Sequence, residues 1–501
     1  MRKKSRIATP VAKTPPAPAP PTTPATRSAS DVPSPSLLYV LASVLLLVPC
    51  YWQSRLQLGD LSSHIYNAWL AQLIESGRAP GLVIVPQTTN VLFDLMLSGL
   101  FKTLGAEAAQ RISVSLAVLT FVWGAFAFVS VVVGRRAWSL LPAIAMLAYG
   151  WVLHMGLFDF YLSLGLCFWA LALAWEWKPR RVAAAAPVLI LAYVAHGLPV
   201  AWAVALLAYL WLGRPMTPRN RAIPMAGSLA AMVAARAVVT GMTSYIWLPQ
   251  QIVTITGTDQ LWVFDFKYVL PFAGLLVILV LLFVRLLGKS GARNVVSSLP
   301  FQIGVLTAAG VFIVPTRLQI PGYNHPLVYI AERMSLAVGV CLCALLAAAP
   351  MRAYHRYAIA VVALLFFGFL YRDEGALNAF EDRMTRLVSQ LPPGQRVVSA
   401  ISDPTLRVNA LAHMIDRACL GRCYSYANYE PATAQFRIRA IAENPIVVST
   451  DNDSLCLQDG SYVVKQRDLP LYQVDLDQAG HMAIRILTAG AQSGITYWKV
   501  L

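Results

Sequence analysis

Charged residues are scarce in this sequence. Only 13% of its 501 residues are Asp, Glu, Lys or Arg, whereas a soluble globular protein carries about 25%. Acids are the scarcer sign, with 24 Asp and Glu against 40 Lys and Arg, so the formal charge is +16. The shortage of charge excludes an ordinary soluble enzyme. A basic excess can indicate nucleic-acid binding, but a chain that is 57% hydrophobic is a poor candidate, so we expect no nucleic-acid partner.

Cysteines and common catalytic motifs are also few. Seven cysteines exclude a disulfide-dense scaffold. The sequence has no P-loop, no GxGxxG, no HExxH, and no GxSxG on a strand-to-helix turn. These absences remove the motif-based cases for nucleotide binding, zinc proteolysis and serine hydrolysis.

What the chain has instead is a series of long apolar runs between Leu37 and about Tyr371. A helix needs roughly 20 apolar residues to cross the hydrocarbon core of a bilayer. We therefore predict about eleven transmembrane helices, at residues 37–53, 109–134, 138–153, 157–177, 183–196, 198–213, 222–246, 268–288, 299–315, 327–349 and 357–371. His196-Gly197 leaves open whether 183–213 is two spans or one kinked helix.

The basic residues predict the orientation of these spans. Residues 1–36 hold nine prolines and six basic residues, which predicts a disordered tail. Together with every second loop, this tail carries 19 basic residues and two acids, whereas the other loops and the spans up to Tyr371 hold eight of each. Basic loops stay in the cytoplasm. We expect a bacterial inner-membrane protein with a cytoplasmic N-terminus and a periplasmic, extracytoplasmic C-terminal region.

Residues 372–501 differ from the rest of the chain. Acids and bases nearly balance there, and short β-patterned runs occur at 396–401 and 446–450, with helical stretches near 374–390 and 405–418. This pattern predicts an α/β domain. The expected fold is therefore a polytopic α-helical membrane domain over 37–371, between the tail and an extracytoplasmic α/β domain.

Three of the cysteines lie in this outer domain. An oxidising compartment permits a disulfide, either between Cys419 and Cys423 or between one of them and Cys456. Zinc is a weaker alternative, because the CxxxC spacing with one distant cysteine is not a recognised zinc motif. His413 and the run Tyr424–Glu430 in the same domain are candidates for acceptor recognition, and packing in the core is the alternative for the run.

The long outer loop, residues 54–108, holds the leading candidate for chemistry. Two amphipathic helical runs, 59–77 and 90–101, follow the first span. Asp60 opens the first run and shares a face with His64 and Asn67 by helical spacing. An acid at this position also suits an N-terminal helix cap, so a structural role for Asp60 is the alternative.

These features resemble the GT-C superfamily, membrane glycosyltransferases that take a sugar from a polyprenyl-phosphate carrier. The likeness consists of an acid, Asp60, opening a large first outer loop with two juxtamembrane helices, about eleven spans with short cytoplasmic loops, and a closing extracytoplasmic α/β domain. Protein mannosyltransferases and lipid A aminoarabinose transferases of this superfamily typically have Asp-Glu in that loop. Here Leu61 follows Asp60, so the subfamily and any role of a second carboxylate stay open.

The resemblance implies an activity and partners. A polyprenyl-phosphate sugar would be the donor, a glycan, lipid or protein the acceptor, and membrane lipid the surroundings. Asp60 would act as general base toward the acceptor hydroxyl, or would bind a divalent metal, Mg²⁺ or Mn²⁺, that assists the leaving phosphate. We favour the base.

Further polar residues gather on the predicted outer side, where they are candidates for substrate binding because ionisable groups at membrane depth tend to line sites. Besides His64 they are His154, Asp159, His196, Arg317, His325, Glu332 and Arg333. Each has a structural alternative as a cap, an ion pair or a packed interface residue. Two other functions stay open for the chain: a transporter or flippase of a lipid or polysaccharide precursor, and a non-catalytic scaffold of envelope assembly.

Overall fold

The computed structural model describes residues 35–323, 325–477 and 479–501. The chain divides into two compact units, Met1–Leu45 and Leu46–Leu501. The described part of the first unit is most of helix α1 (Pro35–Leu47). The predicted disordered tail falls almost entirely on residues 1–34, which lie outside the described residues. All other elements belong to the second unit.

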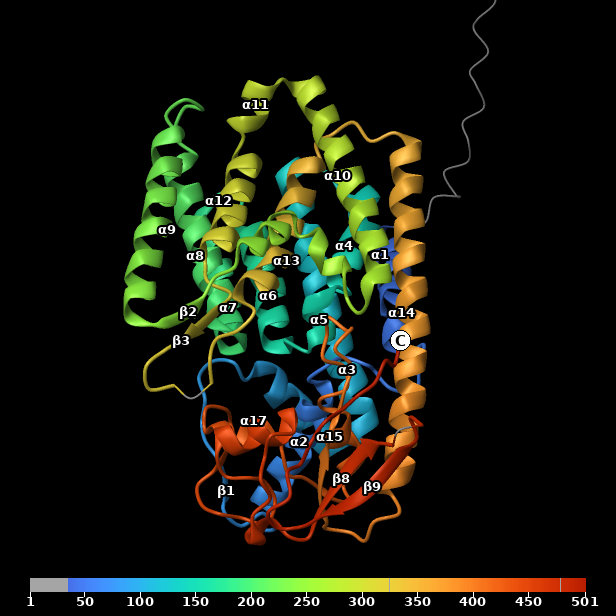
Figure 1. The fold of residues 1–501 in the computed structure, drawn as a ribbon. Coiled ribbons are helices and arrows are strands. Elements are labelled where there is room, and N and C mark those ends of the chain that lie inside the picture. The colour runs from blue at the N-terminus through green and yellow to red at the C-terminus, as the bar shows by residue number, and fades with distance from the viewer. Residues whose placement is uncertain (1–34, 324, 478) are drawn as a thin grey trace, which may run out of the picture. The chain divides into compact units, whose positions relative to one another are not determined.

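The second unit is mostly helical (Figure 1). Its α-helices are α2 (Leu61–Glu75), α3 (Leu92–Val133), α4 (Leu141–Ala148), α5 (Trp151–Met155), α6 (Phe158–Ala174), α7 (Pro179–Ala195), α8 (Gly197–Gly213), α9 (Ala222–Met242), α10 (Val269–Ser290), α11 (Ala292–Val296), α12 (Leu299–Ile313), α13 (Ile330–Leu346), α14 (Ala353–Val388), α15 (Met414–Cys419), α16 (Tyr429–Thr433) and α17 (Asp451–Asp459). Short 3₁₀ turns are η2 (Val48–Cys50), η3 (Trp138–Leu140), η4 (Pro249–Thr256), η5 (Thr258–Leu261), η6 (Phe266–Tyr268) and η7 (Gln466–Asp468).

Several of these helices indicate a membrane-embedded protein. In the described residues, five helical segments are long and apolar enough to cross a membrane: Leu92–Val133, Trp138–Met155, Ala222–Met242, Phe266–Ser290 and Ala353–Val388. Four shorter apolar helices are Ser36–Cys50, Phe158–Ala174, Gly197–Gly213 and Leu299–Ile313. The total of about eleven spans stays a prediction.

Residues 54–108 contain the two predicted helical runs. The first is α2, and the second is the opening part of α3, which continues into the predicted span at 109–134. Gly105 separates the second run from that predicted span. Its φ of +80° and ψ of 173° are not helical and suit glycine alone. The open question at 183–213 has a clear answer: His196 is extended, with φ −163°, and separates two helices, α7 and α8.

Helix α14 crosses the predicted domain boundary. The predicted span at 357–371 and the predicted helix at 374–390 form one helix of 36 residues, about 54 Å long at 1.5 Å per residue. Figure 1 shows it as a single rod beside α10 that ends near strand β9 (Met482–Leu487). The change in composition at 372 marks a change in surroundings within a continuous helix.

The C-terminal region contains sheet. Its main sheet has the order β6 (Tyr424–Ser425), β4 (Arg396–Ser399), β8 (Leu471–Leu476) and β9. Strand β4 runs parallel to both neighbours, and β8 and β9 form an antiparallel pair in which Leu471 faces Leu487. Buried Val398, Leu471 and Leu487 contribute to one core with Val448 and Leu457. A parallel two-stranded sheet joins β5 (Ile401–Ser402) and β10 (Thr496–Tyr497).

Two local predictions in this region are wrong. Residues 446–450 form no strand, because the side-chain oxygen of Asn444 accepts the amide hydrogens of Ile446 and Val447 (2.9 Å each) and removes them from sheet pairing. The helix expected at 405–418 is reduced to α15. The Asp403 carboxylate binds the backbone and the hydroxyl of Thr405, which favours a turn over a helix start at that point.

Two small sheets join distant parts of the chain. Strand β1 (Leu82–Ile84), between α2 and α3, pairs antiparallel with β7 (Ile438–Ala440) of the C-terminal region. Strand β2 (Ser244–Ile246) pairs antiparallel with β3 (Arg317–Gln319). The β1–β7 pair ties the segment that carries Asp60 to the C-terminal region by backbone hydrogen bonds.

Candidate functional site

Asp60 is held in place through its backbone. The amide of Gly59 donates to the carbonyl of His154 (2.7 Å), and the amide of Asp60 donates to the carbonyl of Met155 (3.2 Å). Helix α5 ends at Gly156, which has a φ of +85°. A Cβ atom on Gly156 would lie 2.5 Å from the Asp60 nitrogen, so only glycine lets the two segments meet. This contact fixes Asp60 against the helix bundle.

The Asp60 side chain does not have the expected structural role. Asp60 occupies the N-cap position of α2, yet within the described part of the chain its carboxylate accepts no amide hydrogen of that helix. Instead the carboxylate lies 3.5 Å from Nε2 of His413, with its side chain 26% exposed. An acid at a helix start that caps nothing is available for other chemistry.

His413 lies between two carboxylates. Its Nδ1 is 3.1 Å from Asp416, three residues along the chain on α15, while its Nε2 faces Asp60. Burial opposes protonation of His413, but the hydrogen bond to Asp416 and the nearby acids outweigh it and raise the pKa of His413 above 6.5. The Ser425 hydroxyl donates to Asp416 and holds that carboxylate. Asp60, His413 and Asp416 therefore form a connected row.

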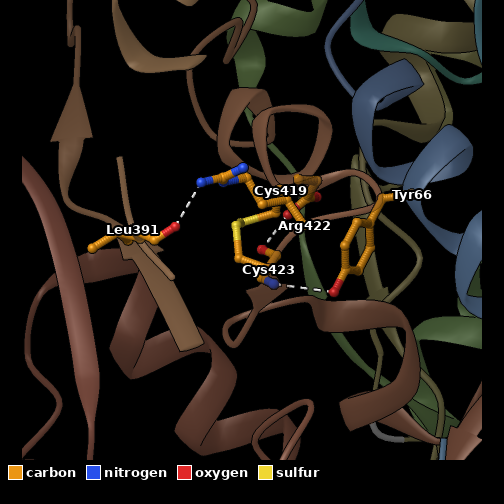
Figure 2. The surroundings of a disulfide bond; sticks show 7 residues. Tyr66, Leu391, Cys419, Arg422 and Cys423 are labelled. Carbon is orange, nitrogen blue, oxygen red and sulfur yellow. Dashed lines mark hydrogen bonds between the residues drawn. A yellow bond between two sulfur atoms is a disulfide. The ribbon is translucent and has the colours of Figure 1, made fainter. Parts of the chain in front are cut away.

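A disulfide fixes helix α15, which carries Asp416 and begins directly after His413. Cys419, the last residue of α15, is bonded to Cys423, which confirms the first of the predicted pairings, and Cys456 is free. Figure 2 shows the bond beside Tyr66 of α2, whose hydroxyl accepts the amide hydrogen of Ser425 (3.0 Å). On the other side of the bond, Arg422 donates to the carbonyl of Leu391. The disulfide sets the distance between α15 and β6.

Arg417 anchors the same helix to three other segments. Its guanidinium pairs with Glu381 of α14 (2.8 Å) and donates to Gln110 of α3 (2.9 Å) and to the carbonyl of Leu56 (3.0 Å). Both charged side chains are almost fully buried, at 7% and 0% exposed. A buried pair needs such additional hydrogen bonds to offset desolvation, and here they position His413 next to Asp60.

Aromatic rings lie beside His413. Tyr429 packs against the rings of His413 (5.3 Å between centroids) and His325 (6.0 Å), and Phe436 contacts both Tyr429 and His325. Burial lowers the pKa of His325, so this imidazole is neutral at physiological pH and has one donor and one acceptor nitrogen. Flat rings with a few polar atoms suit a sugar ring.

Arg333 supplies a buried positive charge near Asp60. It is 9% exposed, and its Nη2 donates to the carbonyl of Val328 (2.6 Å). Its Nε atom is buried and has no hydrogen-bond partner among the described residues. An unsatisfied buried donor costs about 1–3 kcal/mol, so this atom is suited to an anionic ligand. The carboxylates that stabilise the Arg333 charge are Glu332 and Asp60.

Tyr329, the residue before the helix that carries Arg333, has an unusual backbone conformation. Tyr329 caps α13 with a φ of +58°, in the left-handed region that non-glycine residues rarely adopt. Its ring packs against Trp151 (5.4 Å). The Asp60 carboxylate interacts electrostatically with Tyr329 as well as with His325, Arg333, His413 and Tyr429. Asp60 is thus the common neighbour of side chains from three parts of the chain, and we call this set the Asp60 cluster.

A second polar group lies one helical turn along α2. His64 Nδ1 is 2.6 Å from Asp94, and its ring packs against Phe93 and Phe158. Burial disfavours the charged imidazole, but the Asp94 carboxylate dominates and raises the pKa of His64 to about 10. Burial, then Asp94, raises the pKa of Glu430 to about 8. His64 therefore forms a lasting ion pair with Asp94 at neutral pH.

The other predicted site residues have partners of their own. Asp159 accepts the amide hydrogen of Phe93 (2.8 Å) and so caps the start of α3. His154 is fully buried against Glu374 (3.2 Å), and the ring of His196 accepts the amide hydrogen of Leu198 at the start of α8. Glu332 accepts from Thr316, and Arg317 is exposed on β3. Of the predicted substrate-binding residues, the structure brings His325 and Arg333 near Asp60.

Sequence reasoning missed Tyr329 and the pairing role of Asp416. The spacing of Asp416 three residues after His413 indicates a helical pair, and this signal could have found it. Tyr329 has no such signal, because only the backbone shows its left-handed conformation.

The metal alternative stays a prediction. Among the described residues, no group of three or more His, Cys, Asp and Glu side chains could hold a metal ion. Magnesium often binds through one or two carboxylates together with substrate phosphates, so a role of Asp60 toward a metal would depend on bound donor.

Comparisons with known proteins identified no relative of this chain. No family model matches the chain, and no curated protein or solved structure is similar to it.

Proposed function

We propose that this protein is a membrane glycosyltransferase of GT-C type. It transfers a sugar from a polyprenyl-phosphate donor to an envelope acceptor at the outer face of a bacterial inner membrane. In this proposal the N-terminus is cytoplasmic, and the C-terminal region is periplasmic. The acceptor is a glycan, a lipid or a protein.

One observation carries the proposal. An acid that caps nothing, Asp60, shares a cluster with a buried arginine whose Nε has no partner among the described residues. Transfer from a lipid phosphate needs these two groups: a base for the acceptor hydroxyl and a cation for the phosphate that leaves. A scaffold would not require that they converge.

The reaction assigns a role to each group. The acceptor oxygen bonds to the anomeric carbon of the sugar as the bond from that carbon to the phosphate oxygen breaks, through an oxocarbenium-like state. Asp60 takes the proton of the acceptor hydroxyl. Arg333 stabilises the charge that develops on the leaving lipid phosphate. His413 orients Asp60 and is a positioning residue, while Tyr429 and His325 offer a surface for a sugar.

The test is transfer by the purified protein with a panel of polyprenyl-phosphate sugars, read as released lipid phosphate. Asp60→Asn should lower the rate about 10²- to 10⁴-fold, the usual contribution of a general base. Arg333→Gln should lower it about 10²- to 10³-fold, as loss of one donor to a developing anion does. The matched controls Asp459→Asn and Arg293→Gln change exposed residues and should keep the wild-type rate.

Size-exclusion chromatography in detergent shows whether each variant is folded. Full activity of folded Asp60→Asn with a donor that the wild type uses would refute the catalytic role. Absence of turnover by the wild type with every polyprenyl-phosphate sugar, alongside movement of such a lipid across vesicles, would favour the flippase instead.

A further inference from the structure

A group of basic side chains lines a cavity far from Asp60. The cavity has a volume of about 650 Å³ and lies where the ends of α3 and α10 meet the start of α14. Its lining includes Arg135, Arg136, Lys289 and Arg356, together with Trp138 and Met351. We call this space the basic cavity.

The basic cavity lies at the opposite end of the bundle from the Asp60 cluster. Helices α10 and α14 run antiparallel, since Lys267 pairs with Asp373 (2.9 Å) while Arg285 lies over the ring of Tyr354. Lys289 and Arg356 are therefore at one end of this pair. Glu381, which binds Arg417, lies 25 residues beyond Arg356 on α14, about 38 Å away along the axis.

Basic side chains dominate the described lining of this cavity. The described residues that line it include four basic side chains and no Asp or Glu. The sequence has no acid between Glu107 and Asp159. Between Asp265 and Asp373 it has Glu332 alone, which lies at the start of α13, whereas the cavity lies beyond the end of that helix. Like charges that face one another in a cavity repel, so a bound anion would stabilise this arrangement.

The cavity wall is partly organised in advance. Nη2 of Arg135 donates to the carbonyl of Ala347 (2.8 Å), which holds this guanidinium against the connection between α13 and α14. The chain reaches Arg135 through Gly134, whose φ of +71° ends α3. Trp138 and Met351 add apolar surface next to the cations. Tryptophan is typical of the membrane interface, and a basic pocket between membrane helices suits an anionic lipid headgroup.

We propose that the basic cavity binds the phosphate headgroup of an anionic phospholipid from the adjacent leaflet. The cations bind the phosphate, and the apolar residues beside them contact the first part of the acyl chains. A free phosphate would use the cations alone. The proposal does not depend on the reaction at Asp60.

Native mass spectrometry of the full-length protein in detergent tests the proposal, with phosphatidylglycerol and phosphatidylcholine titrated as probes. Wild-type protein should bind phosphatidylglycerol with clear preference. The double variant Lys289→Gln/Arg356→Gln should bind it about 10- to 30-fold more weakly, because two basic contacts are lost. The matched control Arg293→Gln/Arg352→Gln removes the same charge from residues of the same region that do not line the cavity, and it should bind like the wild type.

Three results would overturn the proposal. These are equal binding of the two lipids by the wild type, an equal loss of affinity in the control, and unchanged affinity in the double variant. Competition with inorganic phosphate separates the two sources of the anion. Phosphate at concentrations equal to the lipid should not displace it, and displacement at parity would assign the cavity to a free anion.

Discussion

Because the Asp60 side chain does not cap α2, Asp60 can be substituted with little effect on the stability of the fold. An Asp that caps a helix stabilises it by about 1 kcal/mol, but α2 begins with no such bond from Asp60. The backbone of Asp60 contributes to the start of α2 instead, because its carbonyl accepts the amide hydrogen of His64 (3.0 Å). Asparagine would keep this backbone bond. Loss of activity in Asp60→Asn would therefore report on chemistry, because the substitution removes little that holds the fold.

The His64–Asp94 pair predicts a dependence of stability on pH. The pKa of His64 is raised to about 10 from 6.5, so the stabilisation is fully present below pH 6.5 and is lost as the pH rises through about 10. We expect His64→Gln to melt at least about 2 °C below the wild type at pH 7. This difference should shrink at pH 10, where about half of the wild-type molecules have lost the charge on His64.

Thermal unfolding in detergent at the two pH values measures this difference. The control is His481→Gln, which alters a histidine 79% exposed beside Asp477 and should melt like the wild type at both values. A His64→Gln difference that stays constant or grows between pH 7 and pH 10 would contradict the assigned ion pair.

Among the elements, α15 is short but strongly constrained. Six residues are too few to form a stable helix alone, so α15 depends on the Cys419–Cys423 bond and on Arg417. The double variant Cys419→Ser/Cys423→Ser should lose about 2 kcal/mol of stability, the effect of opening a short covalent loop. It should also lose transfer activity, because His413 precedes α15 directly.

Melting and transfer rates with and without a reducing agent measure this effect. Wild-type protein should lose activity upon reduction, while the serine double variant should not respond further. Cys456→Ser should behave like the wild type in both conditions. If reduction leaves both the melting temperature and the rate of the wild type unchanged, the disulfide does not hold His413 in place.

For the whole molecule, the distribution of charge predicts one orientation. Basic residues concentrate around the basic cavity and the other loops of the predicted cytoplasmic face, whereas Asp60 and the sheet lie at the other end of α14. Cys456 is the one free thiol that is partly exposed, and the other four free cysteines are buried. A membrane-impermeant maleimide should therefore label Cys456 in intact spheroplasts.

A reciprocal variant completes this experiment. Cys456→Ser combined with Arg293→Cys places the exposed thiol on the opposite face, and it should be labelled only after the membrane is opened. The reverse result for the two proteins would invert the proposed topology and place Asp60 in the cytoplasm.

The sequence predicted the parts of this site that depend on local pattern. Helix α2, Asp60 at its start and the strand at 396 follow from helical period, cap position and alternation. The contact between Asp60 and His413 joins residues 353 positions apart in sequence, and the β1–β7 pair is equally remote. No local pattern encodes such contacts, because they depend on tertiary packing. The predicted boundary at 372 falls inside α14, because the composition changes there whereas the helical period does not.

The continuity of α14 has a consequence for how this protein can evolve. One inserted residue near its middle would rotate everything beyond it by about 100° and shift it by 1.5 Å. Asp373, Glu374, Asn378 and Glu381 lie on this half and bind Lys267, His154, Ser54 and Gln57. All four contacts would be lost together. Insertions and deletions within α14 should therefore be tolerated far less than those in loops. The number of residues between its two ends should stay constant in related sequences.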